Sequence, residues 1–188
     1  MTDRRFFFFL LAVIPWYFLF AQLYVTFPIY LSLLAGEDAV PKMFMVNGLV
    51  GLIFMVASMT VMENVAPRKV LPRVYMMASV FFFSAPLLST AWWFLLFVGC
   101  YTLVETLILP AIETLVTELA PEGSQSTFFG ALSVASAIGG SLGYYSGSWM
   151  TLNTAGNTMW SVFASVGALG FALSFWFVRT QIMMHPRG

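Results

Sequence analysis

Six apolar stretches follow one another along this chain, and each is close to the length that a helix needs to cross a lipid bilayer. A helix rises ~1.5 Å per residue, so about 20 residues cross the ~30 Å of hydrocarbon. Short polar or turn-forming segments separate the stretches. They predict an all-α membrane protein with a single six-helix transmembrane domain over residues 1–188, with helices at about 6–34, 43–62, 74–88, 91–119, 127–150 and 159–178.

The scarcity of charged residues supports this class. Only 9% of the residues are charged, whereas a soluble domain carries roughly 25%. Such a chain cannot cover a water-exposed surface, so the lipid bilayer is expected around most of the exterior. The net charge of zero predicts no nucleic-acid partner. With one cysteine, Cys100, and one histidine, His185 in the tail, neither a metal site nor a cofactor is predicted, and no catalytic residues for an enzyme are found.

Lysine and arginine are distributed unevenly between the two sides that six spans define. Lys42 is the single basic residue on one side, and seven lie on the side that holds both termini. The positive-inside rule therefore predicts a multi-pass protein of the cell (inner or plasma) membrane with both termini in the cytoplasm. The apolar run continues past Ala21 to Ala35, which favours a retained first helix over a cleaved signal peptide. The seven residues are Arg4, Arg5, Arg68, Lys69, Arg73, Arg179 and Arg187, of which Arg68, Lys69 and Arg73 form a predicted cytoplasmic basic loop.

Glu105 is the strongest candidate for chemistry. It lies at the centre of the fourth apolar stretch, 14 residues from each end, and therefore near the bilayer midplane. A charge at that depth costs at least about 2.5 kcal/mol, and a carboxylic acid avoids the cost by holding a proton. A group that gains and loses a proton with access to water is what proton coupling requires. The structural alternative is a neutral glutamic acid that is hydrogen-bonded between helices.

The same stretch contains a second acid and a proline. Glu113 lies two turns after Glu105 and is either a second proton station or an interfacial carboxylate solvated from the cytoplasm. Pro110 lies between them and removes one backbone hydrogen bond, which predicts a kink suited to a gating helix. Pro28 raises the same question in the first helix. The alternative is that prolines are tolerated in membrane helices without such a role.

Polar side chains in the first two helices are candidates for lining a substrate cavity. Gln22, Thr26 and Tyr30 are spaced by four and share one helix face, and Asn47 lies in the second stretch. Hydrogen bonding between helices is the alternative role. On the fifth stretch, a GxxxGxxxG run predicts a flat face for close helix packing rather than a phosphate-binding loop. The glycines of this run are Gly139, Gly143 and Gly147.

Several sequence segments resemble a known transporter family. ETLILP at 105–110, ELAPEG at 118–123, TFFG at 127–130 and the glycine-rich run resemble helices ten and eleven of the drug:proton antiporter branch of the major facilitator superfamily. Gln22 with FPIYL at 27–31 resembles the family's seventh helix. The segment ENVAPRKVL at 63–71 resembles the basic loop motif between helices eight and nine, although the usual glycine and aspartate are absent. The resemblance covers nearly the whole chain.

This resemblance implies a C-terminal half bundle made of two inverted three-helix repeats. It implies one half of a secondary active transporter, with proton-coupled efflux of small lipophilic molecules, in which Glu105 matches the acid that takes part in proton coupling. The substrate cavity would form only against a second six-helix half, supplied by a homodimer or by a separate N-terminal half. In the family arrangement, helices one, two, four and five face that partner. The alternative is a truncated remnant, or a membrane interaction subunit, that transports nothing.

Overall fold

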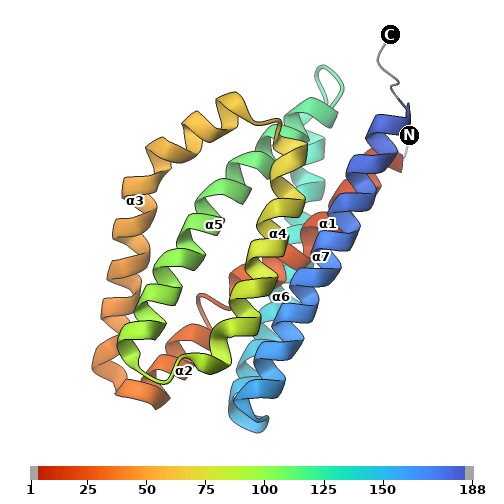
Figure 1. Ribbon diagram of the computed structural model, residues 1–188. Coiled ribbons are helices and arrows are strands. Elements are labelled where there is room, and N and C mark those ends of the chain that lie inside the picture. Colours follow the sequence, from red (N-terminus) through yellow and green to blue (C-terminus); the bar gives the residue numbers. More distant parts are fainter. Residues whose placement is uncertain (1–3, 185–188) are drawn as a thin grey trace.

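The computed structural model describes residues 4–184, and within that range the chain forms helices joined by short turns (Figure 1). Within residues 4–184, six helical segments are long and apolar enough to cross a membrane, so the predicted fold class is confirmed. The start of α1 and the end of α7 lie at the same end of the bundle (Figure 1). His185 and Arg187 lie outside the described residues. The helices are α1 (Arg4–Ala21), α2 (Thr26–Ala35), α3 (Val40–Asn64), α4 (Pro67–Ser84), α5 (Ala91–Leu119), α6 (Gln125–Asn153) and α7 (Gly156–Met184), with 3-10 turns η1 (Glu37–Ala39) and η2 (Ala85–Leu87).

The sequence predicted one continuous helix for the first span, residues 6–34, but the structure has two helices there. α1 ends at Ala21 and α2 begins at Thr26, with a turn between them. Pro28 has no N–H to donate to the carbonyl of Tyr24, and its ring would clash with that carbonyl in a regular helix. The backbone hydrogen bonds instead first reach three residues back, from Gln22 N to Leu19 O at 3.0 Å. They then reach five residues back, from Phe27 N to Gln22 O at 2.9 Å. Pro110, by contrast, lies inside the uninterrupted α5.

The third span begins earlier than the sequence predicted. Helix α4 starts at Pro67 rather than near residue 74, and η2 extends the span to Leu87. Proline suits the first position of a helix, and Ala66 before it is extended, at φ −54° and ψ 127°. The prediction that Arg68, Lys69 and Arg73 lie in a loop is therefore wrong. They are exposed residues within the first turns of α4.

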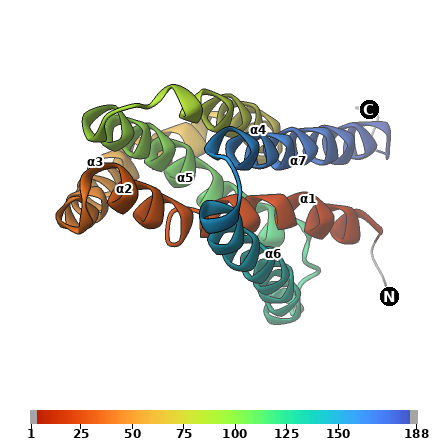
Figure 2. The same ribbon diagram turned by 90° about the horizontal axis from the view of Figure 1, so that it is seen from below.

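The helices pack unequally. α4 lies along α7, and α1 packs against both α6 and α7 (Figure 2). α3 contacts mainly α5. Only 6% of the residues in its most apolar stretch are buried inside the protein, compared with 50% for the first span. The bundle thus has a well-filled centre, where Phe27, Phe82 and Trp160 are fully buried. It also has one helix, α3, whose surface must meet lipid or another protein.

The glycine run of α6 lies directly against α1 and the α1–α2 turn. A Cβ on Gly143 would lie 2.5 Å from the carbonyl oxygen of Phe18 and 2.8 Å from the Cβ of Ala21. Side chains at Gly139 and Gly147 would collide with Ile14 O and with Gln22 Oε1, respectively. Only residues without a side chain allow the two backbones to come this close. The stripe therefore sets the position of the first span against α6.

Candidate functional site: an acid between α3 and α5

Glu105 lies halfway along α5, a 29-residue helix, and its side chain is only partly buried. Helix α5 is held in place on its other faces by buried side chains that include Val104 and Ile108. The acid therefore projects from a firmly packed helix toward α3, which is the least buried span of the bundle. Glu105 therefore remains partly accessible beside the exposed surface of α3.

A hydrogen-bonded cluster joins Glu105 to α3. Asn47 Nδ2 donates to Thr102 Oγ1 at 2.9 Å and to Glu105 Oε2 at 3.3 Å. The Thr102 hydroxyl in turn donates to the carbonyl oxygen of Val98 at 2.8 Å, which orients its lone pairs toward Asn47. The amide thus bridges two helices and reaches an acid 58 residues away in the sequence. An amide donor suits an ionised carboxylate, and a protonated carboxyl group has its own O–H to donate.

The cluster opens onto a cavity of 470 Å³ between α3 and α5. Among the described residues that line this cavity, Glu105 is the only one with an ionisable side chain, and no basic side chain neutralises it there. Small residues on α3, Gly48 and Gly51, leave the space open. The lining residues are Asn47, Gly48, Gly51, Leu52, Met55, Ser58, Thr102, Glu105, Thr106, Leu109 and Pro110.

The two prolines and the second acid have different surroundings. Pro110 lies at the end of the Glu105 cavity, one turn beyond Thr106, so a bend there would move the cavity wall. Pro28 stands just after the break between α1 and α2. Glu113 is exposed and does not belong to the cavity lining, so the structure does not bring the two acids of α5 together at one site.

The polar residues of the first span do not gather at this cavity. Gln22 and Thr26 are fully buried, and Thr26 Oγ1 donates to Gln22 Oε1 at 2.5 Å. Gln22 Nε2 donates to Phe18 O at 2.7 Å and to Gly143 O on α6 at 3.1 Å. Gln22 thus makes a hydrogen bond between helices, which is the alternative role, and Thr26 is hydrogen-bonded to Gln22. Tyr30 is separate again: its ring lies 5.2 Å from that of Trp160, at a smaller pocket of 290 Å³.

Thr102 is a member of the cluster that sequence reasoning missed. Its position three residues before Glu105 places both on one face of α5, and that spacing was a usable signal. Nothing local indicated that Asn47 would meet this face. Among the described residues, no three histidine, cysteine or acidic side chains lie close enough together to hold a metal ion.

Comparison with known proteins decides the family. The family model described as the Major Facilitator Superfamily matches residues 1–144 of the chain. The chain belongs to the Major Facilitator Superfamily. This is a family of membrane transporters, and the predicted resemblance to it is confirmed.

Two multidrug resistance proteins are similar to the chain at low sequence identity. Multidrug resistance protein MdtH of Edwardsiella ictaluri is 26% identical over 97% of this chain, and MdtH of Yersinia pestis is 25% identical over the same share. In each case the match covers 47% of the relative, so this chain spans about half the length of the superfamily members that it matches. No solved structure matches the chain.

Proposed function

We propose that this chain is one half of a secondary active transporter that exports small lipophilic molecules in exchange for protons. The observation that carries the proposal is the carboxyl group of Glu105, held by Asn47 at a cavity whose α3 wall is almost uncovered. Glu105 is the proton-binding residue in this proposal. Pro110 and Pro28 are the points at which the spans bend when the cavity opens to one side of the membrane and closes to the other.

A second six-helix half follows from the chemistry of this cavity. Hydrocarbon offers no hydrogen bonds to Asn47, Thr102 or Glu105, so a polar cavity at this depth must be closed by protein or filled with water. Superfamily transporters enclose their site between two halves. A second copy of this chain or a separate N-terminal half would supply the missing wall, and the matched share of the MdtH relatives is consistent with either.

We expect the completed protein to span the cell membrane six times per half, with both termini in the cytoplasm. Reporter fusions at Gly36 and at Asn153 should then report the outer side, and a fusion at Pro67 the cytoplasm. The basic residues at the start of α4 are the physical reason, because Arg68, Lys69 and Arg73 resist translocation. A cytoplasmic signal at Asn153 would contradict this topology.

Assembly is tested by disulfide cross-linking in native membranes, with Cys100 replaced by alanine. Cysteine at Leu52 on α3 or at Ile138 on α6, both exposed, should yield a covalent pair of six-helix units, by a disulfide to the same cysteine of a second copy or to a cysteine introduced into a separate N-terminal half. Cysteine at Phe175 on α7, which is as exposed as Ile138, is the matched control and should yield none. A protein that stays monomeric and still transports would rule out the second half.

Transport itself is tested in membrane vesicles that contain the cross-linkable assembly, a fluorescent lipophilic dye and an imposed pH gradient. Export of the dye should follow the gradient and stop when a protonophore removes it. If the wild-type chain moves no dye with any candidate second half, the non-transporting alternative is correct.

A further inference from the structure

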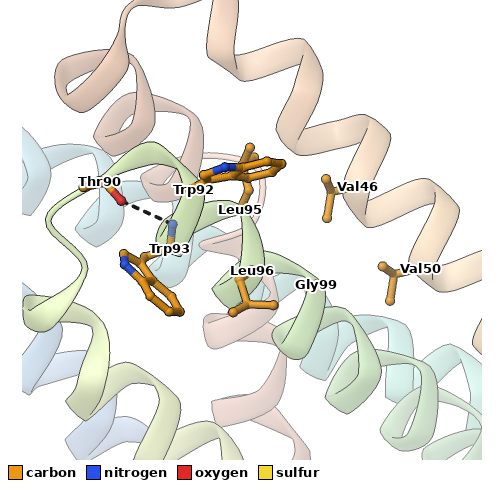
Figure 3. A pocket seen from close by; sticks show the side chains of 8 residues that line it. All are labelled: Val46, Val50, Thr90, Trp92, Trp93, Leu95, Leu96 and Gly99. Carbon is orange, nitrogen blue, oxygen red and sulfur yellow. Dashed lines mark hydrogen bonds between the residues drawn. The ribbon is translucent and has the colours of Figure 1, made fainter.

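A second pocket between α3 and α5 is apolar and has no role in the proposed function (Figure 3). It has a volume of 530 Å³, within the range of about 300–1,000 Å³ typical of small-molecule sites. Figure 3 shows Val46 and Val50 projecting from α3 toward α5, with Trp92 and Trp93 at the start of α5. Its one hydroxyl, that of Thr90, already accepts from Trp93 N at 3.5 Å. The lining is Val46, Val50, Thr90, Trp92, Trp93, Leu95, Leu96 and Gly99.

This pocket and the Glu105 cavity share no lining residue, and on α3 they occupy different faces. Asn47 and Gly51 each follow a pocket residue, Val46 and Val50, and so lie about 100° further around α3. Val46 and Val50 meet Gly99, since a Cβ on this glycine would lie 3.6 and 3.7 Å from their side chains, whereas Gly51 meets Thr102. If the face of α3 that carries Asn47 and Gly51 meets a second half, the face that carries Val46 and Val50 turns toward lipid.

The depth of the pocket matches the membrane interface. It is formed by the first turns of α3 and α5, and Trp92 and Trp93 remain 79% and 59% exposed there. Exposed tryptophans at a span's end are typical of the headgroup level. Lys42 lies one helical turn before Val46, on the same face of α3, and is exposed. Lys42 therefore places a cation one helical turn from Val46, on the α3 face that lines the apolar pocket.

We propose that this pocket binds one acyl chain of a membrane phospholipid, with the lipid phosphate at Lys42. The lining supplies apolar contact along the chain, and Lys42 supplies a charge-assisted contact for the phosphate. Glu37 and Asp38 precede Lys42 and are also exposed, so this end of α3 has no excess of positive charge. The occupant is therefore a phospholipid of zero net charge rather than an anionic one. The orientation of the pocket toward lipid rests on the second half in the proposed function, whereas lipid binding itself does not require transport.

The test is photolabelling of the reconstituted protein in phosphatidylcholine vesicles. A fraction of the lipid carries a diazirine in its acyl chain, and adducts are located by peptide mass spectrometry. Adducts should concentrate at 46–50 and 92–99 relative to the lipid-exposed segment 169–176 of α7. Gly99→Leu should lower labelling of the pocket about tenfold, because its side chain takes the space of at least two methylene groups.

Matched variants separate this site from general lipid contact. Gly130→Leu, at a glycine with nothing within 4 Å of its Cβ position, should leave the labelling unchanged. Lys42→Gln, at an exposed site that does not threaten folding, should lower it several-fold, and replacing part of the lipid with phosphatidylglycerol should not raise it. Unchanged labelling in Gly99→Leu and Lys42→Gln would overturn the proposal. Displacement of the label by the exported dye would also overturn it, because the pocket would then be a substrate site.

Discussion

Replacing Glu105 with glutamine should reduce proton-driven dye export to the level of vesicles without protein, while the protein still inserts and folds. Glutamine has nearly the same shape as the protonated acid and can still accept from Asn47 Nδ2, but it cannot release a proton. Removing an ionisable group from mid-membrane leaves insertion unchanged or improves it. Dye binding, measured without a gradient, should survive because the 470 Å³ cavity keeps its size.

The measurement compares wild type with Glu105→Gln and Glu113→Gln in the same vesicles under the same pH gradient. Glu113→Gln is the matched control, since it makes the same chemical change on the same helix at an exposed position outside the cavity. It should transport like the wild type. Normal export by Glu105→Gln would make the acid structural and end the coupling proposal. Loss of export in Glu113→Gln alone would mean that the other carboxylate carries the proton.

Alanine at Gly143 should destabilise the bundle by about 1–3 kcal/mol, the usual effect of forcing extra atoms into a packed contact. The new Cβ would lie 2.5 Å from Phe18 O, and a backbone oxygen cannot move aside as a flexible side chain can. α6 would have to separate from α1. That shift would also stretch the 3.1 Å hydrogen bond from Gln22 Nε2 to Gly143 O.

Gly140→Ala is the control for this prediction, because it adds the same methyl group to a neighbouring turn of the same helix. Nothing lies within 4 Å of its Cβ position. Alanine is also the better helix former, so Gly140→Ala should leave the stability unchanged or slightly higher. The free energy of unfolding is measured by titrating the purified protein in mixed micelles with dodecyl sulfate. Equal losses in the two variants would show that the close contact between α6 and α1 does not stabilise the fold.

The sequence predicted the number of spans because apolar length is a local property of the chain. The predicted helix boundaries were wrong where charged residues indicated a loop but proline geometry allowed a helix. Arg68, Lys69 and Arg73 suggested a loop, yet Pro67 starts a helix whose first turns contain all three as exposed residues. Pro28 was recognised as a site of distortion, but the sequence did not distinguish a kink from the complete break that the structure has between Ala21 and Thr26.

By itself, the sequence determined that this is a membrane protein with six apolar segments of spanning length, and that one acid, Glu105, lies at the middle of one of them. Each of these depends on composition and on distance along a single helix. Only the tertiary structure decided which residues meet. Gln22 and Asn47 were equal candidates for the cavity, but the break in the first span and the glycine stripe of α6 bury Gln22 against Gly143. Asn47 reaches Glu105 because α3 packs on α5, and that pairing depends on contacts between segments far apart in the chain.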